Sequence, residues 1–415
     1  MKKKKIVFVI NYFYPDFAST GQLMTELCLD LQNDFDITVI AAQPNYAGEK
    51  VSTKKIFEED RLENMKIIRI RLPEVDKTSK LSRMKYIFSY FTLANVALLK
   101  EKDVDLIYTI SQPPVLGGLI GTIGKFLKRT KHVYNVQDFN PEQAAAVSYT
   151  NKQSIFKIAK KIDMLNCNYA DCVIVVGNDM SETLKRRFAG KKVPNHTVIN
   201  NWTNEQEIVP LDKSNEFIKQ FLAENDLEDK FIIMYSGNVG LYYDLENIVK
   251  VTDYFKGKED LAFVFIGEGA VKQEMQEFVH NKKISNVYFL PYQPKEFIKY
   301  SLNAADIHLV VNQKGIKGVS VPSKIYGVMA AGKPILGVLE QGSEAQMLIE
   351  KSNSGIVVEP QDYEGIIQTI DQFYEMEKSK IKELGSNGRE YLDGNLKREI
   401  SINKYRNLLN QITKS

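Results

Sequence analysis

Short, fully apolar runs alternate with longer stretches of helical period along the first half of the chain. Runs of Val and Ile without polar alternation are typical of strands buried on both faces of a parallel sheet. Such runs occupy residues 5–10, 37–41, 65–70, 105–110, 132–137, 172–176 and 197–199. Apolar residues spaced by three or four predict helices at 21–32, 80–100, 115–128, 154–169 and 180–188. The alternation predicts an α/β domain with helices on both faces of its sheet.

The same pattern restarts in the second half, after a charged segment without strand signal. Predicted strands there cover residues 231–235, 262–266, 287–289, 307–311, 335–338 and 355–358. Predicted helices cover 245–254, 271–280, 295–302, 323–331 and 344–351, with a mostly helical remainder. We therefore expect two doubly wound Rossmann-like domains, 1–202 and 230–395, facing across a cleft. Residues 203–229 are expected to form a linker, and a C-terminal helix at 396–415 to pack back on the first domain.

Charge separates the two halves although the net charge of the 415 residues is only +3. Through Trp202 there are 30 Lys and Arg against 21 Asp and Glu, and the remainder has 25 against 31. The basic first half suggests an anionic partner. Hydrophobic residues make up 44% and charged residues 26%, which excludes disordered and collagen-like classes.

Several classes of protein are excluded by what the sequence lacks. Three cysteines are too few for a disulfide framework or a zinc site, and we expect them to be buried in a reducing cytoplasm. No apolar stretch reaches the ~18 residues of a membrane span. A P-loop and a dinucleotide G-x-G-x-x-G are both absent. No aspartate cluster offers oxygen ligands, so we expect no metal.

In a doubly wound sheet, ligands bind beyond the carboxyl ends of the strands, so loops that follow strands are the candidates. Ser19, Thr20 and Gly21 open the first predicted helix, where backbone N–H groups attract anions. Asp138 and Glu142 follow the strand at 132–137 and suit acid–base chemistry or contacts with sugar hydroxyls. An ordinary N-cap is the alternative at both places, with Asn140 a second candidate cap in the latter loop.

Two glycine turns follow neighbouring predicted strands in the second half. Gly237, Asn238 and Gly240 come after the first, and Glu268 and Gly269 after the next. Such turns let the backbone approach a diphosphate closely. The alternative is that each is a tight turn between a strand and a helix.

The stretch from Gly318 to Pro334 is the richest in candidate chemistry. Ser323 is expected to cap the helix that follows, and Lys324 stands in its first turn, where the helix dipole favours carboxylates. A bound anion would explain a cation in that place. Glu344 opens the next helix, either complementing its dipole or accepting two ribose hydroxyls.

Together these motifs resemble the retaining family-4 glycosyltransferases with the GT-B fold. The resemblance is strongest in Ser-Gly-Asn-x-Gly, Gly-Glu-Gly and Pro-Ser-Lys-x-Tyr-Gly-x-Met-Ala-Ala-Gly-Lys-Pro. Tyr-Phe-Tyr-Pro-Asp, Val-Gln-Asp-Phe-Asn-Pro-Glu and Val-Ile-Asn-Asn-Trp are similar to the subgroup that builds bacterial capsule, O-antigen or exopolysaccharide.

The resemblance implies a donor site for a nucleoside-diphosphate sugar, a UDP-linked hexose or N-acetylated amino sugar, in the second domain. The implied donor-binding residues are Gly237, Asn238, Gly240, Glu268, Gly269, Ser323, Lys324 and Glu344. The implied acceptor-side residues are Ser19, Thr20, Gly21, Asp138 and Glu142, with Asp138 and Lys324 catalytic. No cofactor or metal is implied.

The sequence departs from the family at several positions. The family commonly carries two glutamates separated by seven residues, and Val319 and Gly327 stand there. The ribose role therefore moves to Glu344. Gln137 replaces the usual histidine ahead of Asp138.

The implied acceptor is a saccharide on a polyprenyl diphosphate, with the protein peripheral on the inner face of the cell membrane. The segment 80–91 mixes cations with aromatic residues, as membrane-surface helices do, and Lys185, Arg186 and Arg187 add to the basic field. An ordinary amphipathic helix on its sheet is the alternative.

Other functions remain as rivals on sequence alone. A GT-B epimerase would need paired histidines and carboxylates at the sugar, and His308 lies inside a predicted strand, where we expect a core residue. A non-enzymatic anion-binding module is a further alternative. Nucleic-acid binding lacks a recognition motif.

Overall fold

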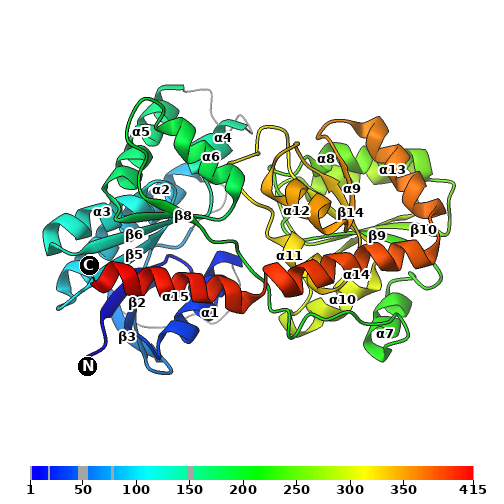
Figure 1. The fold of residues 1–415 in the computed structure, drawn as a ribbon. Coiled ribbons are helices and arrows are strands. Elements are labelled where there is room, and N and C mark those ends of the chain that lie inside the picture. Colours follow the sequence, from blue (N-terminus) through cyan, green and yellow to red (C-terminus); the bar gives the residue numbers. More distant parts are fainter. Residues whose placement is uncertain (1, 17–18, 45–54, 76–78, 147–152, 415) are drawn as a thin grey trace. The chain divides into compact units, whose positions relative to one another are not determined.

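The computed structural model describes residues 2–16, 19–44, 55–75, 79–146 and 153–414, and the chain forms two compact units (Figure 1). The N-terminal unit contains Met1–Ala145, Thr150–Asn200 and Ile402–Ser415. The C-terminal unit contains Asn201–Ser401. Each is built on one sheet, and the prediction of two Rossmann-like α/β domains is confirmed.

The sheet of the N-terminal unit has the order β3-β4-β2-β1-β5-β6-β7-β8. All its described pairings are parallel except that of β3 with β4. Its strands are β1 Lys5–Val9, β2 Asp36–Ala42, β3 Phe57–Leu62, β4 Met65–Ile70, β5 Leu106–Ile110, β6 Lys131–Val136, β7 Cys172–Val175 and β8 His196–Val198. The carboxyl ends of β1, β5 and β6 are therefore neighbours along one edge.

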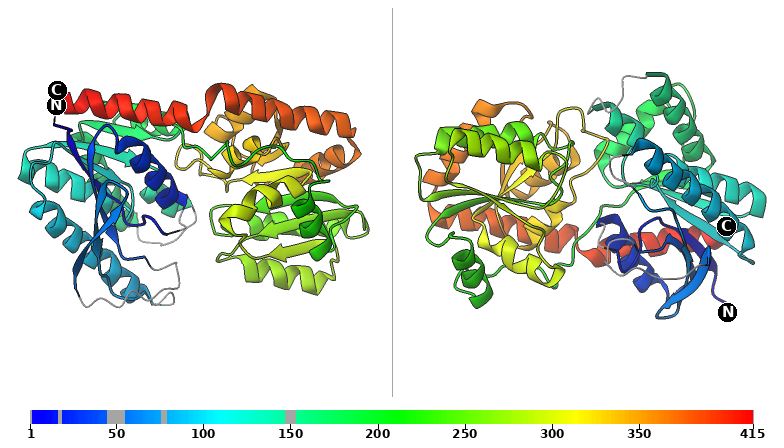
Figure 2. Two further views of the ribbon diagram at one scale, coloured as in Figure 1. Left: turned by 90° about the horizontal axis from the view of Figure 1, so that it is seen from below. Right: turned by 180° about the vertical axis from the view of Figure 1, so that it is seen from behind.

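Helices cover this sheet on both faces, and the last one comes from the far end of the sequence (Figure 2). They are α1 Ser19–Leu31, α2 Lys80–Lys100, α3 Leu116–Lys128, α4 Asn140–Ala146, α5 Gln153–Tyr169, α6 Asn178–Arg187 and most of α15 Arg398–Lys414. Buried Asn135 on β6 donates to Tyr405 Oη at 3.0 Å, and Arg406 pairs with Asp34 at 2.8 Å. These contacts attach α15 to the N-terminal unit.

The sheet of the C-terminal unit has the order β11-β10-β9-β12-β13-β14, all parallel. Its strands are β9 Phe231–Ser236, β10 Leu261–Ile266, β11 Val287–Leu290, β12 Ile307–Val311, β13 Ile335–Val338 and β14 Gly355–Val358. Alternate residues of β9 enter different cores. Ile233 and Tyr235 join one cluster, and Ile232 and Met234 join another on the opposite face.

The helices of this unit divide between those two faces. They are α7 Glu216–Glu224, α8 Leu245–Ile248, α9 Lys272–Lys282, α10 Ile298–Ala304, α11 Lys324–Ala330, α12 Glu344–Ser352, α13 Tyr363–Glu375 and α14 Lys378–Asn395, with 3₁₀ helices η1 Val249–Phe255 and η2 Lys295–Phe297. α7 lies in the expected linker, yet Ile218, Phe221 and Leu222 pack into a core of the C-terminal unit. That segment therefore contains a docked helix.

No helix within the described ranges is both long enough and apolar enough to cross a membrane.

Candidate functional site

The glycine turns after β9 and β10 interlock through their backbones. Gly237 N donates to Ile266 O at 2.9 Å, and Val239 N donates to Glu268 O at 2.9 Å. A Cβ on Gly267 would lie 1.9 Å from Gly237 O, and one on Gly269 would lie 2.0 Å from Val239 O. Glycine is therefore needed in the second turn to let the first turn approach. For Gly269, this packing supports a tight turn between a strand and a helix over a turn that approaches a diphosphate.

Gly237 in the first turn faces a different neighbour. Its φ of +144° is a conformation that side chains rarely adopt. A Cβ there would point at the Lys324 side chain, 3.4 Å from Cε and 3.8 Å from Nζ. The structure therefore brings the predicted glycine turn and the predicted cation together.

Lys324 is held by two tyrosines at the start of α11. Its Nζ donates to Tyr235 Oη at 2.6 Å and lies 4.0 Å from the ring centroids of both Tyr235 and Tyr243. No carboxylate of the described residues forms an ion pair with it. Burial lowers the pKa of Lys324 to about 7. A cation with aromatic and hydroxyl partners, but no counter-ion, can receive an anion.

Tyr235 also fixes the turn itself, since its hydroxyl donates to Asn238 O at 2.6 Å. Neither tyrosine was predicted as a site residue. In the sequence, Tyr235 looks like the last residue of a buried strand. Its hydroxyl gains a role only because α11 brings Lys324 next to it in the folded chain.

Ser323 does not cap α11, contrary to the prediction. It occupies the N-cap position with φ −59° and ψ −20°, and its side chain makes no capping hydrogen bond. The backbone is already helical there, whereas a capping serine normally has extended geometry. The Ser323 hydroxyl stands next to Lys324 without a hydrogen bond to the residues described, so it can bond to a ligand.

The two predicted glutamates of this unit have different surroundings. Glu268 is largely exposed and pairs with Lys272 Nζ at 2.7 Å, while the same Nζ donates to Gly267 O at 2.9 Å. Lys272 is thus a second cation at these turns, which the prediction missed because it lies one helical turn beyond the motif.

Glu344 is only 3% exposed, in the first turn of α12, and it interacts with other residues of the chain. This position suits a carboxylate that complements the helix dipole. Such burial does not support the expected contact with a ribose.

In the N-terminal unit, Asp138 follows β6 in a loop held by Ser111 of the neighbouring strand end. Ser111 Oγ accepts from Gln137 N at 3.1 Å and from Asp138 N at 3.3 Å. Asn140 Nδ2 donates to Ser111 O at 2.8 Å, so Asn140 ties the loop to β5. Asp138 is partly exposed at the edge where ligands of such sheets bind.

Glu142, predicted on the acceptor side, is engaged in a buried ion-pair network. Arg187 Nε donates to Glu142 Oε1 at 2.9 Å, its Nη2 contacts Oε2, and its Nη1 donates to Asp163 Oδ2 at 2.6 Å. Lys160 adds a contact to Glu142 at 3.1 Å, and Arg187 stacks 3.9 Å above the Phe139 ring. Glu142 therefore anchors the Asp138 loop instead of presenting a carboxylate to a ligand, and Arg187 is not part of a surface basic field.

The glycine of the first predicted anion site has a packing role. A Cβ on Gly21 would lie 2.9 Å from Tyr12 O. Thr20 is partly exposed in the first turn of α1, and the Ser19 side chain lies outside the described residues. Thr20 thus stands in the helix that follows β1 and Asp138 in the loop that follows β6, and β5 lies between those two strands.

His308 is a core residue, as expected. It is 1% exposed, its Nε2 lies 2.9 Å from Leu302 O, and burial lowers its pKa to about 4. It supplies no acid or base to the site.

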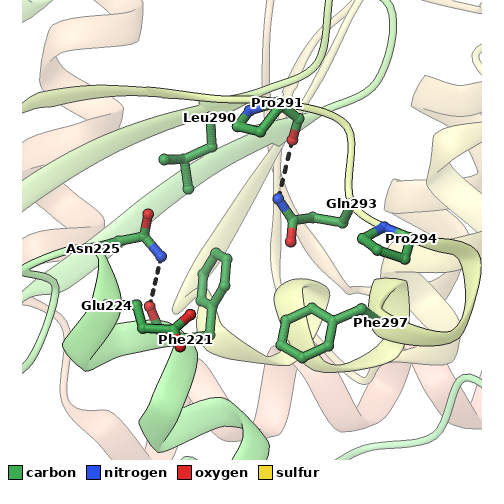
Figure 3. Close-up of a pocket in the computed structure, with 8 residues that line it drawn as sticks. All are labelled: Phe221, Glu224, Asn225, Leu290, Pro291, Gln293, Pro294 and Phe297. Carbon is green, nitrogen blue, oxygen red and sulfur yellow. Dashed lines mark hydrogen bonds between the residues drawn. The ribbon is translucent and has the colours of Figure 1, made fainter.

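A surface pocket of about 400 Å³ lies elsewhere in the C-terminal unit, between α7 and the end of β11 (Figure 3). Its lining residues are Phe221, Glu224, Asn225, Leu290, Pro291, Gln293, Pro294 and Phe297. The amides of Asn225 and Gln293 donate to backbone carbonyls within this lining. The pocket contains none of the predicted site residues and no cation.

Comparison with known proteins indicates the family and the fold. Residues 216–391 match the family described as "Glycosyl transferases group 1". The chain is 27% identical over 406 residues to the probable glycosyltransferase WbjE of Pseudomonas aeruginosa, covering 97% of this chain and 96% of that protein. It is 24% identical over 420 residues to the putative colanic acid biosynthesis glycosyl transferase WcaI of Escherichia coli K12, covering 97% and 99%.

Solved structures share the fold of the whole chain. The sucrose-phosphate synthase of Thermosynechococcus elongatus superposes with a TM-score of 0.76 at 16% identity, covering 99% of both chains. Anabaena Alr3699/HepE, in complex with UDP and glucose, superposes with a TM-score of 0.70 at 14% identity, covering 98% and 99%. The fold is therefore GT-B, and together the findings support a glycosyltransferase with homologues in surface-polysaccharide biosynthesis.

Proposed function

We propose that this glycosyltransferase moves a sugar from a nucleoside-diphosphate sugar to a lipid-linked glycan, with retention of anomeric configuration. The donor is a UDP-linked hexose or N-acetylated amino sugar, and the product belongs to capsule, O-antigen or exopolysaccharide synthesis. The observation that carries the proposal is that the Lys324 ammonium lies beside the Gly237 turn and has no carboxylate partner among the residues that the structure describes.

The donor diphosphate would bind in the C-terminal unit. Gly237 lets the backbone approach the phosphates, Lys324 supplies a positive charge, and Ser323 supplies a hydroxyl. HepE, a protein of the same fold, was solved with UDP and glucose. That likeness supports a nucleotide-sugar ligand for this chain.

Transfer would depend on positioning and on charge stabilisation. As the bond from the anomeric carbon to the diphosphate oxygen breaks, negative charge grows on the leaving group, and Lys324 stabilises it. The acceptor hydroxyl forms the new C–O bond on the same face, and its proton passes to the leaving diphosphate. Asp138 would orient the acceptor. Because Lys324 and backbone N–H groups supply the positive charge, we propose that no metal is required.

The lipid-linked acceptor would hold the N-terminal unit on the inner face of the cell membrane. Among the described residues, fourteen of the eighteen large hydrophobic side chains that are exposed lie in this unit. On α2 these include Leu81, Met84 and Phe88, spaced along one face beside exposed Lys85. Exposed apolar residues with neighbouring cations suit an anionic membrane surface.

The aromatic residues of the segment 80–91 lie partly in the core and partly on the surface. Tyr86 and Tyr90 are buried in the unit and Phe88 is exposed. Two of the aromatic residues that suggested a membrane-surface helix are therefore core residues.

The proposal is tested by incubating the protein with a panel of UDP- and GDP-sugars, with and without polyprenyl-diphosphate saccharides. We expect release of one nucleoside diphosphate that increases with the lipid acceptor, and NMR of the product should give the donor's anomeric configuration. Turnover unchanged by EDTA would agree with metal-independent transfer. Binding without release from any donor would favour an anion-binding module and contradict the proposal.

A further inference from the structure

The hydroxyl of Tyr235 stands at the centre of the hydrogen bonds that hold the Lys324 ammonium. It accepts from Lys324 Nζ at 2.6 Å and donates to Asn238 O at 2.6 Å. The Tyr235 side chain is fully buried at the end of β9, so its position is fixed by the core of the C-terminal unit. One rigid group therefore connects the cation to the backbone of the glycine turn.

Other lysines of this unit are held in a different way. Lys213, Lys258 and Lys272 each contact a carboxylate oxygen at 2.7 Å. A carboxylate partner neutralises a lysine, whereas a phenol oxygen orients the ammonium and leaves its charge uncompensated. The faces of the Tyr235 and Tyr243 rings stabilise the same charge without cancelling it.

We propose that Tyr235 is a positioning residue for the donor diphosphate, because its hydroxyl fixes the Lys324 ammonium and the Asn238 carbonyl in one arrangement. The inference rests on the proposed function, since it assumes that a nucleoside diphosphate is the anion bound. Tyr235 acts through Lys324 and the turn without touching the ligand. Preset charge of this kind lowers the cost of ordering the site when the ligand arrives.

The hydroxyl has a second effect, on the protonation of Lys324. A hydrogen bond to the charged form of a group favours that form. Burial already lowers the pKa of Lys324 to about 7, and loss of the acceptor would lower this pKa further. The loss should therefore cost more binding at pH 8 than at pH 6.5.

The test compares Tyr235→Phe with Tyr243→Phe by titration calorimetry, using UDP and inorganic pyrophosphate as probes at pH 6.5 and 8. Both variants keep the ring face toward Lys324. We expect Tyr235→Phe to weaken UDP binding roughly tenfold or more at pH 8 and less at pH 6.5, on the scale of a hydrogen bond to a charged group. Tyr243→Phe should change the affinity less than threefold.

A double-mutant cycle with Lys324→Ala separates positioning from a structural role. If Tyr235 acts through Lys324, its substitution should have little further effect on UDP affinity in the Lys324→Ala background. Additive losses, or an equal loss at both pH values, would overturn the inference. Thermal unfolding of each variant checks that the fold is kept.

The outcome also distinguishes this inference from the proposed function. Wild-type protein that binds neither UDP nor pyrophosphate would contradict both. Wild-type protein that binds UDP, with an unchanged affinity in Tyr235→Phe, would contradict only the role of Tyr235.

Discussion

Lys324 has a pKa close to neutral pH, and within the described part of the chain no carboxylate forms an ion pair with it. Desolvation in a tyrosine cage lowers its pKa to about 7, which disfavours the charged form in the ligand-free protein. A ligand with two phosphates would remove that penalty by supplying the missing negative charge. The residue therefore couples binding of the anion to uptake of a proton.

Replacing Lys324 by alanine removes this charge and should lower transfer by about two orders of magnitude, the scale for loss of one donor to a developing oxyanion. The initial rate of nucleoside-diphosphate release measures the effect. Lys314→Ala is the matched control, because Lys314 is exposed in the loop before α11. Near-normal turnover of Lys324→Ala would remove this residue from the mechanism.

The affinity for UDP should fall as the pH rises from 7 to 9. The charged form of Lys324 binds the anion, and its pKa in the ligand-free protein is about 7 instead of the usual 10.5. Above pH 7 the ammonium must be reprotonated on binding, so affinity should fall by up to about tenfold per pH unit. Calorimetry in buffers of different ionisation enthalpy should detect this proton uptake at pH 8. A profile as flat as that of Lys324→Ala would show that another group carries the charge.

The same lowered pKa affects folding in the opposite direction: the stability of the folded protein rises with pH, whereas the affinity for UDP falls. The unfolded chain binds the proton up to its ordinary pKa of 10.5, whereas the folded protein releases it above about 7. The destabilisation is therefore full below pH 7 and is lost as the pH rises towards 10.5. The position costs stability at neutral pH, as expected of a site shaped for a ligand.

At the scale of elements, the hydrophobic periodicity of the sequence predicted the buried strands but missed a strand whose sequence is dominated by charge. β3, Phe-Glu-Glu-Asp-Arg-Leu, was not predicted, because it is an edge strand that, among the described strands, pairs with β4 alone, in antiparallel register. α7 was assigned to a linker, because its apolar residues fill a core made by strands later in the chain. Both misses depend on partners distant in sequence.

The same limit applied to the site. The sequence placed Gly237, Lys324 and Asp138 correctly in loops after strands or at a helix start. It could not show that Arg187 of α6 binds Glu142 next to the Asp138 loop. It also could not show that residue 269 must be glycine because a Cβ there would clash with Val239 O. Those facts depend on distances between elements, which residue spacing does not contain.

The network around Arg187 should be important for the stability of the N-terminal unit. Arg187 joins α6 to α4 and α5 through Glu142 and Asp163, with its side chain almost completely buried. Arg187→Leu would leave two carboxylates without their main partner, and breaking a buried pair in this way costs about 3–5 kcal/mol. The midpoint of urea unfolding measures the loss.

Lys160→Met is the matched control for that network. Lys160 contacts the same Glu142 carboxylate, but its side chain is 45% exposed, and exposed pairs contribute about 0–1 kcal/mol. Equal losses in the two variants would contradict the view that burial of Arg187 sets its contribution.

At the scale of the whole molecule, exposed apolar residues gather on the unit whose sequence is basic. Phe126 and Leu127 on α3 and Ile158 and Leu165 on α5 are exposed in addition to the residues of α2. α3 packs against both α2 and α5, so the three helices are neighbours on one face of the sheet. Charge and apolar exposure thus occur in the same unit, which agrees with a membrane partner for it.

We expect the protein to pellet with anionic liposomes at low salt, because basic residues are attracted to the lipid surface and exposed apolar side chains enter it. Salt should reduce the pelleted fraction, since the attraction is screened.

Phe88→Ser, which removes a side chain 61% exposed on α2, should lower the pelleted fraction several-fold, and addition of Ile158→Ser should lower it further. Tyr254→Ser is the control, because Tyr254 is 65% exposed in the C-terminal unit. Equal losses in Phe88→Ser and Tyr254→Ser, or no pelleting of the wild-type protein, would contradict docking through the N-terminal unit. Nucleotide-sugar binding should remain unchanged in all three variants, because membrane contact and donor binding are proposed for different units of the chain.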